Sequence, residues 1–200
     1  MSEKEKMLAG NLYDPSDEEL NRLRIKARKL VRRYNQIDED EPEKQLELLH
    51  ALLPNTAAIP SLQAPIYFDY GCNTTFGKFS CANFNLTCLD VCPVTIGDNV
   101  LIGPNVTLAT PMHPLLPVER NIRRREDGSV YNLEYAKPIV IENDCWLASS
   151  VIVCGGVTIG EGSVIGAGSV VTRDIPPHSL AAGNPCKVIR EITETDSIEL

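Results

Sequence analysis

The chain has 200 residues, a length that suits one hydrophobic core with a small appendage. Hydrophobic residues make up 43% and charged residues 23%, which are ordinary values for a globular protein, and no apolar run approaches the length of a membrane span. The net charge of −8 argues against non-specific binding to nucleic acid or to an anionic membrane. The first ten residues, MSEKEKMLAG, are charged and lack the apolar stretch of a secretory signal.

The N-terminal quarter predicts two helices. Ser16 and Glu19 have the spacing of a capping box at the start of the first helix. Its apolar face consists of Leu20, Leu23, Ala27, Leu30 and Tyr34. A second helix begins at Pro42, and its inward residues are Leu46, Leu49 and Leu53. We assign residues 1–58 to a helical cap and expect ordered structure everywhere except at the two ends of the chain.

A repeat of six residues dominates the rest of the chain. From residue 139 the blocks read IVIEND, CWLASS, VIVCGG, VTIGEG, SVIGAG and SVVTRD, and the third residue of each is aliphatic. The same phase occurs upstream. The aliphatic residues of this series are Ile96, Ile102, Leu108, Ile141, Leu147, Val153, Ile159, Ile165 and Val171.

A period of six fits neither an α-helix nor a simple two-sided strand. It fits a short strand plus a turn, with three such units closing a triangular coil of about 18 residues, and coils stacking in parallel about 4.8 Å apart. Gly, Asn and Asp recur at the ends of the blocks, where tight corners favour positive φ. The sequence therefore predicts a mainly β protein, a left-handed parallel β-helix of hexapeptide repeats.

The predicted solenoid spans residues 59–185, followed by a C-terminal tail over 186–200. The repeat is weak near its start, where only Tyr70-Gly71 and Phe76-Gly77 keep the spacing. It stops over residues 109–138, and a loop of this length in a compact domain is usually functional. Three consecutive arginines, Arg123 to Arg125, lie in this loop. Because no aromatic residues are interleaved with them, they favour a solvated loop face over nucleic-acid binding. Such a face could line the mouth of a site.

Seven cysteines occur without a CxxC pair, mostly alternating with aliphatic residues. Such thiols behave as small apolar side chains, so we expect them to be reduced and the protein to be cytoplasmic, with no metal required. A zinc site is the weaker alternative.

Several segments together closely resemble the maltose and galactoside O-acetyltransferases, a family that includes nodulation-type relatives. They are MLAGNLYDPSDEEL, YFDYG, ANFN, LDVCPVTIGDNVLIGPNV, the MHP loop and AAGNPCKVIREI. The resemblance covers about residues 5 to 192 and implies a homotrimer with active sites between subunits. It also implies that acetyl-CoA is the acetyl donor and that a sugar hydroxyl is the acceptor, with direct transfer in a ternary complex. The loop over residues 120–137 is longer than in the maltose type, which leaves the acceptor open.

His113 matches the family's catalytic histidine. A sugar hydroxyl is a weak nucleophile at neutral pH, and a histidine base supplies about 10²–10⁴-fold. The acceptor-binding residues implied by the resemblance are Asp17, Asp69, Asn83 and Asp90. Carboxylates and amides suit vicinal sugar hydroxyls because each forms two hydrogen bonds, although Asp17 also fits a helix N-terminal acid.

Ser149 matches the position that contacts the thioester in the family. Ala167 lies 18 residues later, one full coil, so both should lie on one face beneath an extended pantetheine arm. Trp146 fits either a place beside that arm or ordinary packing. The polar and basic residues expected to bind the phosphates of coenzyme A are Thr172, Arg173, Lys187 and Arg190.

Three alternatives remain on the residues alone. The enzyme could acetylate another acceptor, such as a xenobiotic or a cell-envelope sugar. A zinc hydratase on the same solenoid needs three converging histidines, and only His113 lies near the repeat. A non-catalytic trimeric scaffold would need neither a base nor an anion-binding groove.

Overall fold

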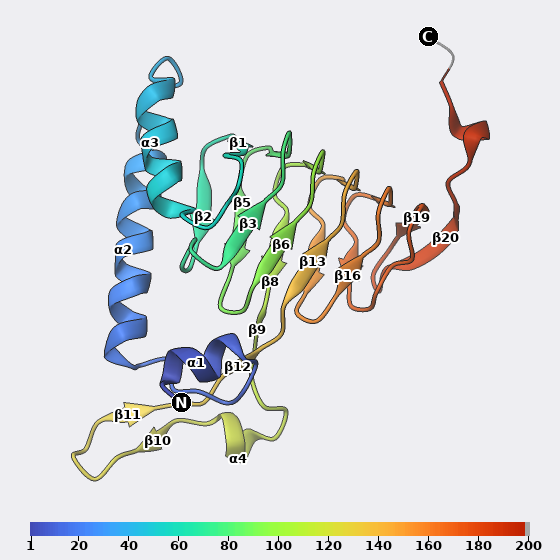
Figure 1. Ribbon diagram of the computed structural model, residues 1–200. Helices are drawn as coiled ribbons and strands as arrows, with labels where there is room; N and C mark the ends of the chain where they lie inside the picture. Colours follow the sequence, from blue (N-terminus) through green and yellow to red (C-terminus); the bar gives the residue numbers. More distant parts are fainter. Residues whose placement is uncertain (199–200) are drawn as a thin grey trace.

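The computed structural model describes residues 1–198, a three-sided prism of short strands with helices across its N-terminal end (Figure 1). The first face contains, in spatial order, β1 (Ser61–Leu62), β4 (Cys81–Ala82), β7 (Leu101–Ile102), β14 (Trp146–Leu147), β17 (Val164–Ile165), β19 (Ser179–Ala182) and β20 (Lys187–Glu191). The second face contains β2 (Ile66–Phe68), β5 (Leu86–Leu89), β8 (Thr107–Ala109), β15 (Ile152–Cys154) and β18 (Val170–Val171). The third face contains β3 (Thr74–Phe76), β6 (Val94–Ile96), β13 (Ile139–Ile141) and β16 (Thr158–Ile159).

Neighbouring strands on each face pair in parallel, apart from the antiparallel pair β19–β20. Consecutive strands of the chain lie on successive faces, so each turn of the chain forms one coil of the prism. The predicted mainly β solenoid of hexapeptide repeats is confirmed.

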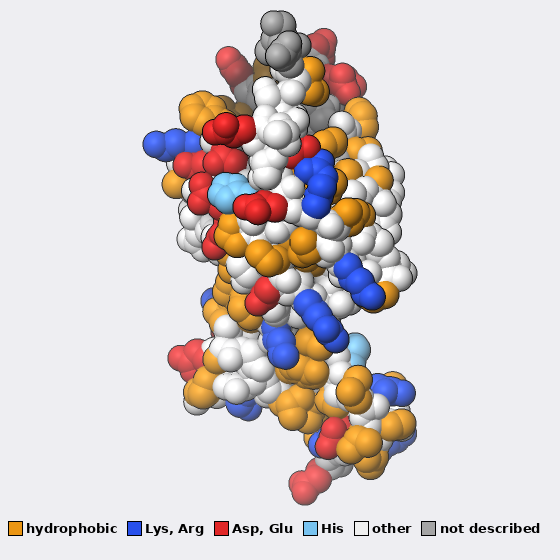
Figure 2. All heavy atoms as spheres, turned by 90° about the vertical axis from the view of Figure 1, so that its right-hand side faces the viewer, with side chains coloured by type: hydrophobic (Ala, Val, Ile, Leu, Met, Phe, Trp, Pro, Cys, Tyr) orange, Lys and Arg blue, Asp and Glu red, His pale blue; other side chains and the backbone are white. Residues whose placement is uncertain are grey.

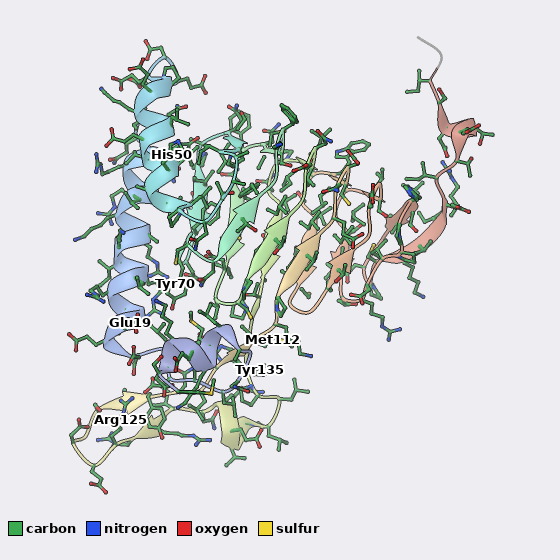
Figure 3. The ribbon with its side chains drawn as sticks, in the orientation of Figure 1. Glu19, His50, Tyr70, Met112, Arg125 and Tyr135 are labelled. Carbon is green, nitrogen blue, oxygen red and sulfur yellow. The ribbon has the colours of Figure 1, made fainter. Side chains whose placement is uncertain are left out.

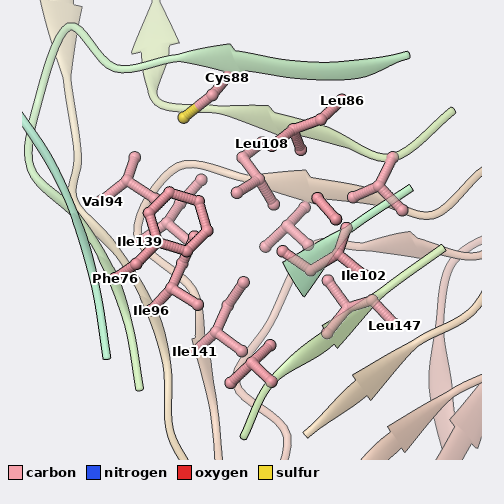
Figure 4. Packing of buried hydrophobic residues seen from close by; sticks show 14 of the residues in the cluster. Phe76, Leu86, Cys88, Val94, Ile96, Ile102, Leu108, Ile139, Ile141 and Leu147 are labelled. Carbon is pink, nitrogen blue, oxygen red and sulfur yellow. The ribbon is translucent and has the colours of Figure 1, made fainter. Parts of the chain in front are cut away.

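The prism encloses a single apolar column. All nine aliphatic residues of the six-residue series are at most 3% exposed, and Figure 4 shows Ile96, Leu108 and Leu147 among the side chains that meet inside. Burying one such side chain contributes about 1.5–3 kcal/mol. The predicted core of the solenoid is confirmed position by position.

Asn and Asp adopt positive φ at the corners, as the block ends predict. Asn85, Asn99, Asn105 and Asp144 have φ between 55° and 63°. Their side chains also connect successive coils, since Asn85 Nδ2 donates to Asn105 Oδ1 at 3.0 Å. These residues tolerate the left-handed region because their short polar side chains bond locally.

One corner explains why the repeat is weak upstream. Between the second and third faces, the matching core positions Cys88 and Val94 are six residues apart, whereas Val153 and Val157, two coils later, are only four apart. The two extra residues recur in the first two coils, and in the third coil the same corner contains the whole insertion. We call this stack of enlarged turns, residues 69–73, 90–93 and 110–138, the wide corner.

The insertion is largely structured. Its two ends pair in antiparallel fashion as β9 (Pro111–Met112) and β12 (Tyr135–Ala136). Between them lie α4 (Pro117–Arg120) and the hairpin of β10 (Arg123–Arg124) and β11 (Val130–Tyr131).

Helices α1 (Glu3–Leu8), α2 (Glu18–Tyr34) and α3 (Pro42–Leu52) form the N-terminal end of the molecule. Helix α1 was not predicted; its N-cap Ser2 makes a capping box with Glu5. The prediction of Ser16 as the cap of α2 is wrong by one residue, because Asp17 accepts the hydrogen bond from the Leu20 amide. In α3 the buried residues are Leu48, Leu49 and Leu52, and the predicted inward residue Leu46 is 47% exposed.

The end of α2 is bonded directly to the first coil. The Tyr34 hydroxyl donates to the Leu62 carbonyl, and the Asn35 side chain exchanges two hydrogen bonds of 2.9 Å with the backbone of Ile66. These bonds fix the orientation of α2 on the first coil, and with it which side of the helix faces the wide corner. At the other end, β20 and a short 3₁₀ helix (Glu194–Asp196) lie within the segment predicted as a tail. No helix in the described chain is long and apolar enough to cross a bilayer.

Candidate active site

His113 follows β9 at the wide corner, and the pairing of β9 with β12 places Glu134 beside it. Met112 is opposite Tyr135 in this antiparallel pair, so His113, which follows Met112, is opposite Glu134, which precedes Tyr135. His113 Nε2 is 4.0 Å from Glu134 Oε1, and the imidazole is half-exposed. The geometry is that of a base with an adjacent carboxylate, open to a ligand on one side.

Tyr13 holds the other oxygen of this carboxylate. Its hydroxyl donates to Glu134 Oε2 at 2.9 Å, and the backbones of the two residues form an antiparallel bridge. Burial, followed by the neighbouring charge of Glu134, raises the pKa of Tyr13, so its hydroxyl remains a donor at neutral pH. Glu134 is thereby oriented with one oxygen towards His113.

These residues border an open cleft of about 540 Å³ between the start of α2 and the wide corner. Its lining residues are Tyr13, Pro15, Ser16, Asn21, Arg24, Arg28, Asp69, Val91, Pro111, His113 and Glu134. Among the predicted site residues, His113 and Asp69 meet here.

Asp69 belongs to the first level of the wide corner and lines the cleft. Arg28 Nη2 donates to its Oδ1 at 3.1 Å, which leaves the second oxygen of Asp69 available to a ligand. Arg24 donates to the Tyr70 hydroxyl, and burial raises the pKa of that phenol to about 12. The cleft therefore presents both carboxylate acceptors and guanidinium donors, a set that suits a polyhydroxylated ligand.

Asp90 does not reach the cleft. Its side chain is fully buried, with Oδ1 accepting from the Tyr70 amide at 2.8 Å and Oδ2 from Thr74 Oγ1 at 3.0 Å. Burial raises its pKa to about 6. We correct its predicted acceptor-binding role to a structural one, in which it connects the first two levels of the wide corner; the neighbouring Val91 lines the cleft instead.

Asp17 caps α2 through its Oδ1 and does not line the cleft, so the alternative explanation for an acid at this position accounts for its geometry. Asn83 lies at the corner between the first and second faces. There it borders a separate depression that also contains Leu101 and Trp146, the latter 50% exposed. Within one chain, Asn83 and His113 are not brought together.

Ser149 and Ala167 are both exposed and follow the paired strands β14 and β17. The Gly168 amide donates to the Ser149 carbonyl at 2.9 Å, so the two residues stack one coil apart, as the 18-residue spacing predicts. Thr172, Arg173 and Lys187 are exposed towards the C-terminal end of the prism, where Figure 2 shows basic and acidic side chains interspersed. Arg190 differs, because its guanidinium forms two hydrogen bonds with Asp196, at 2.7 and 2.5 Å.

Within residues 1–198 no three His, Cys, Asp or Glu side chains gather in a way that could hold a metal ion. The seven cysteines are all free thiols.

Comparison with known proteins identifies the chain. Residues 6–57 match the maltose acetyltransferase hexapeptide capping motif, residues 93–111 match the hexapeptide repeat of succinyl-transferase, and residues 138–173 match six bacterial transferase hexapeptides. The galactoside O-acetyltransferase of Escherichia coli is 43% identical, over 96% of this chain and 90% of its own. The chain belongs to the maltose and galactoside O-acetyltransferase family. It is an acyltransferase.

Solved structures of this acetyltransferase family agree with the fold over almost the whole chain. A maltose O-acetyltransferase from Clostridium difficile superposes with a TM-score of 0.87 and 42% identity, covering 97% of this chain and 99% of the other. A galactoside acetyltransferase in complex with coenzyme A gives a TM-score of 0.86 and 42% identity, covering 98% and 94%.

The sequence predicted only His113 and Asp69 among the residues that line this cleft; those it missed include Tyr13, Arg24, Arg28 and Glu134. Arg24 and Arg28 are four apart on one helix, a spacing that places them on one side and was readable from the sequence. Glu134 carried no such signal, because its position depends on how the two ends of a long insertion pair.

Proposed function

We propose that this protein transfers the acetyl group of acetyl-CoA to a hydroxyl of a sugar, with His113 as general base. The observation that carries the proposal is the His113–Glu134 pair at the edge of a cleft with several hydrogen-bonding groups, in a chain of this family. Two structural relatives, solved in complex with coenzyme A and with acetyl-CoA, support the choice of donor.

The reaction takes place in a ternary complex. A sugar hydroxyl, hydrogen-bonded in the cleft, gives its proton to the imidazole of His113 as its oxygen attacks the thioester carbonyl. The new C–O bond forms, the C–S bond breaks, and the coenzyme A thiolate takes the proton back from the imidazolium. Glu134, 4.0 Å from His113 Nε2, stabilises the imidazolium while it exists.

The donor lies along the exposed corner that Ser149 and Ala167 form. There, small side chains leave room for the pantetheine arm, and Ser149 stabilises the oxyanion of the tetrahedral intermediate. Thr172, Arg173 and Lys187 bind the phosphates. Arg190 can join them with the N–H donors that its pair with Asp196 leaves unused, or by exchanging that pair for one with a phosphate.

We propose that the working form is a homotrimer with each active site between two subunits. The separation of Asn83 and Trp146 from the His113 cleft supports this arrangement, because these residues can serve a site only if they face the cleft of another subunit. Seven free thiols fit a reducing compartment, and we propose the cytoplasm.

The test is a transfer assay with purified protein, acetyl-CoA and a reagent for free thiols, run across maltose, glucose, galactosides and non-sugar hydroxyl compounds. We expect release of coenzyme A that depends on a sugar, and a trimer by light scattering. Release with non-sugar acceptors alone would contradict the proposed acceptor class, and full activity in a monomer would contradict the shared site.

A further inference from the structure

Arg125, the last of the three consecutive arginines, makes a set of contacts that its neighbours lack. Its guanidinium pairs with Asp14 Oδ2, donates to Ser16 Oγ at 3.2 Å and to Ser129 Oγ at 3.2 Å, and lies 4.4 Å above the ring of Tyr131. Both partners of the ion pair are partly buried, with side chains 37% and 17% exposed. A pair with several shared hydrogen bonds and reduced solvent contact holds its geometry better than an exposed surface pair.

The segment that Arg125 grips is a wall of the cleft. Pro15 and Ser16 line it, and Asp14 fixes their turn by accepting hydrogen bonds from the Ser16 amide at 2.9 Å and hydroxyl at 2.6 Å. The same segment is held at its other end by Tyr13, which bridges to Glu134. The insertion therefore contacts residues 13–16 at two points. Glu134 bonds Tyr13 beside His113, and Arg125 bonds Asp14 and Ser16.

The hairpin has little else to hold it in place. Among residues 1–198, strands β10 and β11 pair only with each other, and Val130 and Ile122 are exposed. Figure 3 shows Arg125 on this hairpin, outside the prism. A contact that holds the hairpin against the cleft wall also restrains that wall, which Arg24 and Asn21 of α2 bond from the other side.

We infer that Arg125, together with Asp14 and Ser16, forms a clamp that sets the width of the acceptor cleft and so determines which acceptors fit. Arg125 is a positioning residue: it touches neither His113 nor the proposed path of the donor, and it acts through the Asp14–Ser16 turn. This inference rests on the proposed function, because the cleft it shapes is the proposed acceptor site. It assigns a role to the arginine run that the sequence left as a solvated face.

The test compares Arg125→Ala with Arg124→Ala as the matched control. Arg124 is the exposed last residue of β10, directly before Arg125, and within residues 1–198 its side chain forms no hydrogen bond or ion pair. Loss of a charge-assisted pair predicts a rise of about tenfold in the acceptor KM for Arg125→Ala. The acetyl-CoA KM should change by less than about twofold, because the proposed donor residues lie elsewhere on the prism. The rise in acceptor KM should be smaller for bulkier glycosides than for monosaccharides.

Two further measurements make the result decisive. Asp14→Asn should raise the acceptor KM by a similar factor. The double variant should have an acceptor KM no higher than that of either single variant, since both substitutions remove the same contact. Hydrogen exchange should accelerate in peptides covering residues 13–17 and 123–131, a readout that needs no activity.

An acceptor KM unchanged in Arg125→Ala, or equal rises in the KM of acceptor and donor, would overturn the clamp while the proposed function stands. Failure of the wild-type protein to acetylate any sugar would overturn the proposed function, and the exchange data would still test the contact itself. If Arg125→Ala proves unstable, Arg125→Lys keeps the charge but offers its donors from a single nitrogen in place of the two guanidinium nitrogens that bond Asp14, Ser16 and Ser129, and the same comparison applies to it.

Discussion

The corner between the second and third faces of the prism has short turns at its C-terminal end and enlarged turns at its N-terminal end. In the later coils the turn between the second and third faces is short, and the repeat runs without interruption from residue 139. In the first three coils that turn is enlarged, and it collects a buried carboxylate, a half-exposed histidine and the contacts to α1 and α2. The regular coils bury the apolar core, whereas the enlarged turns carry the candidate catalytic and acceptor-binding side chains. The predictions below test that division.

The largest effect is expected at His113. Replacing it with Ala should lower kcat by about 10²–10⁴-fold, because no other base faces the acceptor hydroxyl in our proposal. Steady-state kinetics with a saturating sugar would measure this. His50→Ala, an exposed histidine on α3, is the control and should leave kcat unchanged. Comparable losses in both variants would mean that His113 has no special role.

Substitutions in the apolar column of the regular region should affect stability and leave the chemical step unchanged. Leu147 is 0% exposed in the apolar column, so Leu147→Ala should lower the free energy of unfolding by about 2–5 kcal/mol. At temperatures where the variant remains folded, its kcat should stay within about twofold of wild type. Denaturant unfolding measures the first effect, and Thr95→Ala, on the outer side of β6, is the matched control and should cost under about 0.5 kcal/mol.

This contrast follows what sequence could and could not predict. The aliphatic positions of the prism were predictable because a period of six has one simple solution in three dimensions. Helix α1 was missed although Ser2 and Glu5 have the spacing of a capping box. The cap at Asp17 and the outward orientation of Leu46 were not predictable, because the exact start of a helix and the orientation of one with many leucines depend on what packs against it. Asp90 was misplaced for a related reason: the extra residues at the wide corner shift side chains between the inside and the outside.

Asp90 should make stability depend on pH. Its pKa in the folded protein is raised to about 6, so the folded state binds a proton more tightly than the unfolded state does between about pH 4 and pH 6. The stability from this group is therefore present at low pH and is lost as the pH rises through that window. Relative to Asp90→Asn, the wild type should lose about 1–3 kcal/mol between pH 4 and pH 7. A difference between the two proteins that is constant with pH would contradict the burial of an ionisable carboxyl.

Glu134 should have a smaller effect that is confined to the chemical step. Glu134→Gln keeps the size of the side chain but removes the charge beside the imidazolium, and kcat should fall by about tenfold. The acetyl-CoA KM should not change. Glu126→Gln, an exposed acid in the same insertion, is the control. An unchanged kcat in Glu134→Gln would show that His113 works without this carboxylate.

The smallest effect is expected where the regular region meets the donor. Arg173→Ala combined with Lys187→Ala should raise the acetyl-CoA KM by about three- to tenfold, because each exposed cation contributes a modest, salt-dependent attraction to phosphate. The acceptor KM should stay constant. Equal increases for both substrates would remove these residues from the donor site.

A crystal structure with coenzyme A and a sugar bound together tests the proposed site most directly. We expect a sugar hydroxyl about 2.6–3.2 Å from a nitrogen of His113, within the cleft between α2 and the wide corner. A sugar bound on the regular faces of the prism, away from His113, would contradict it.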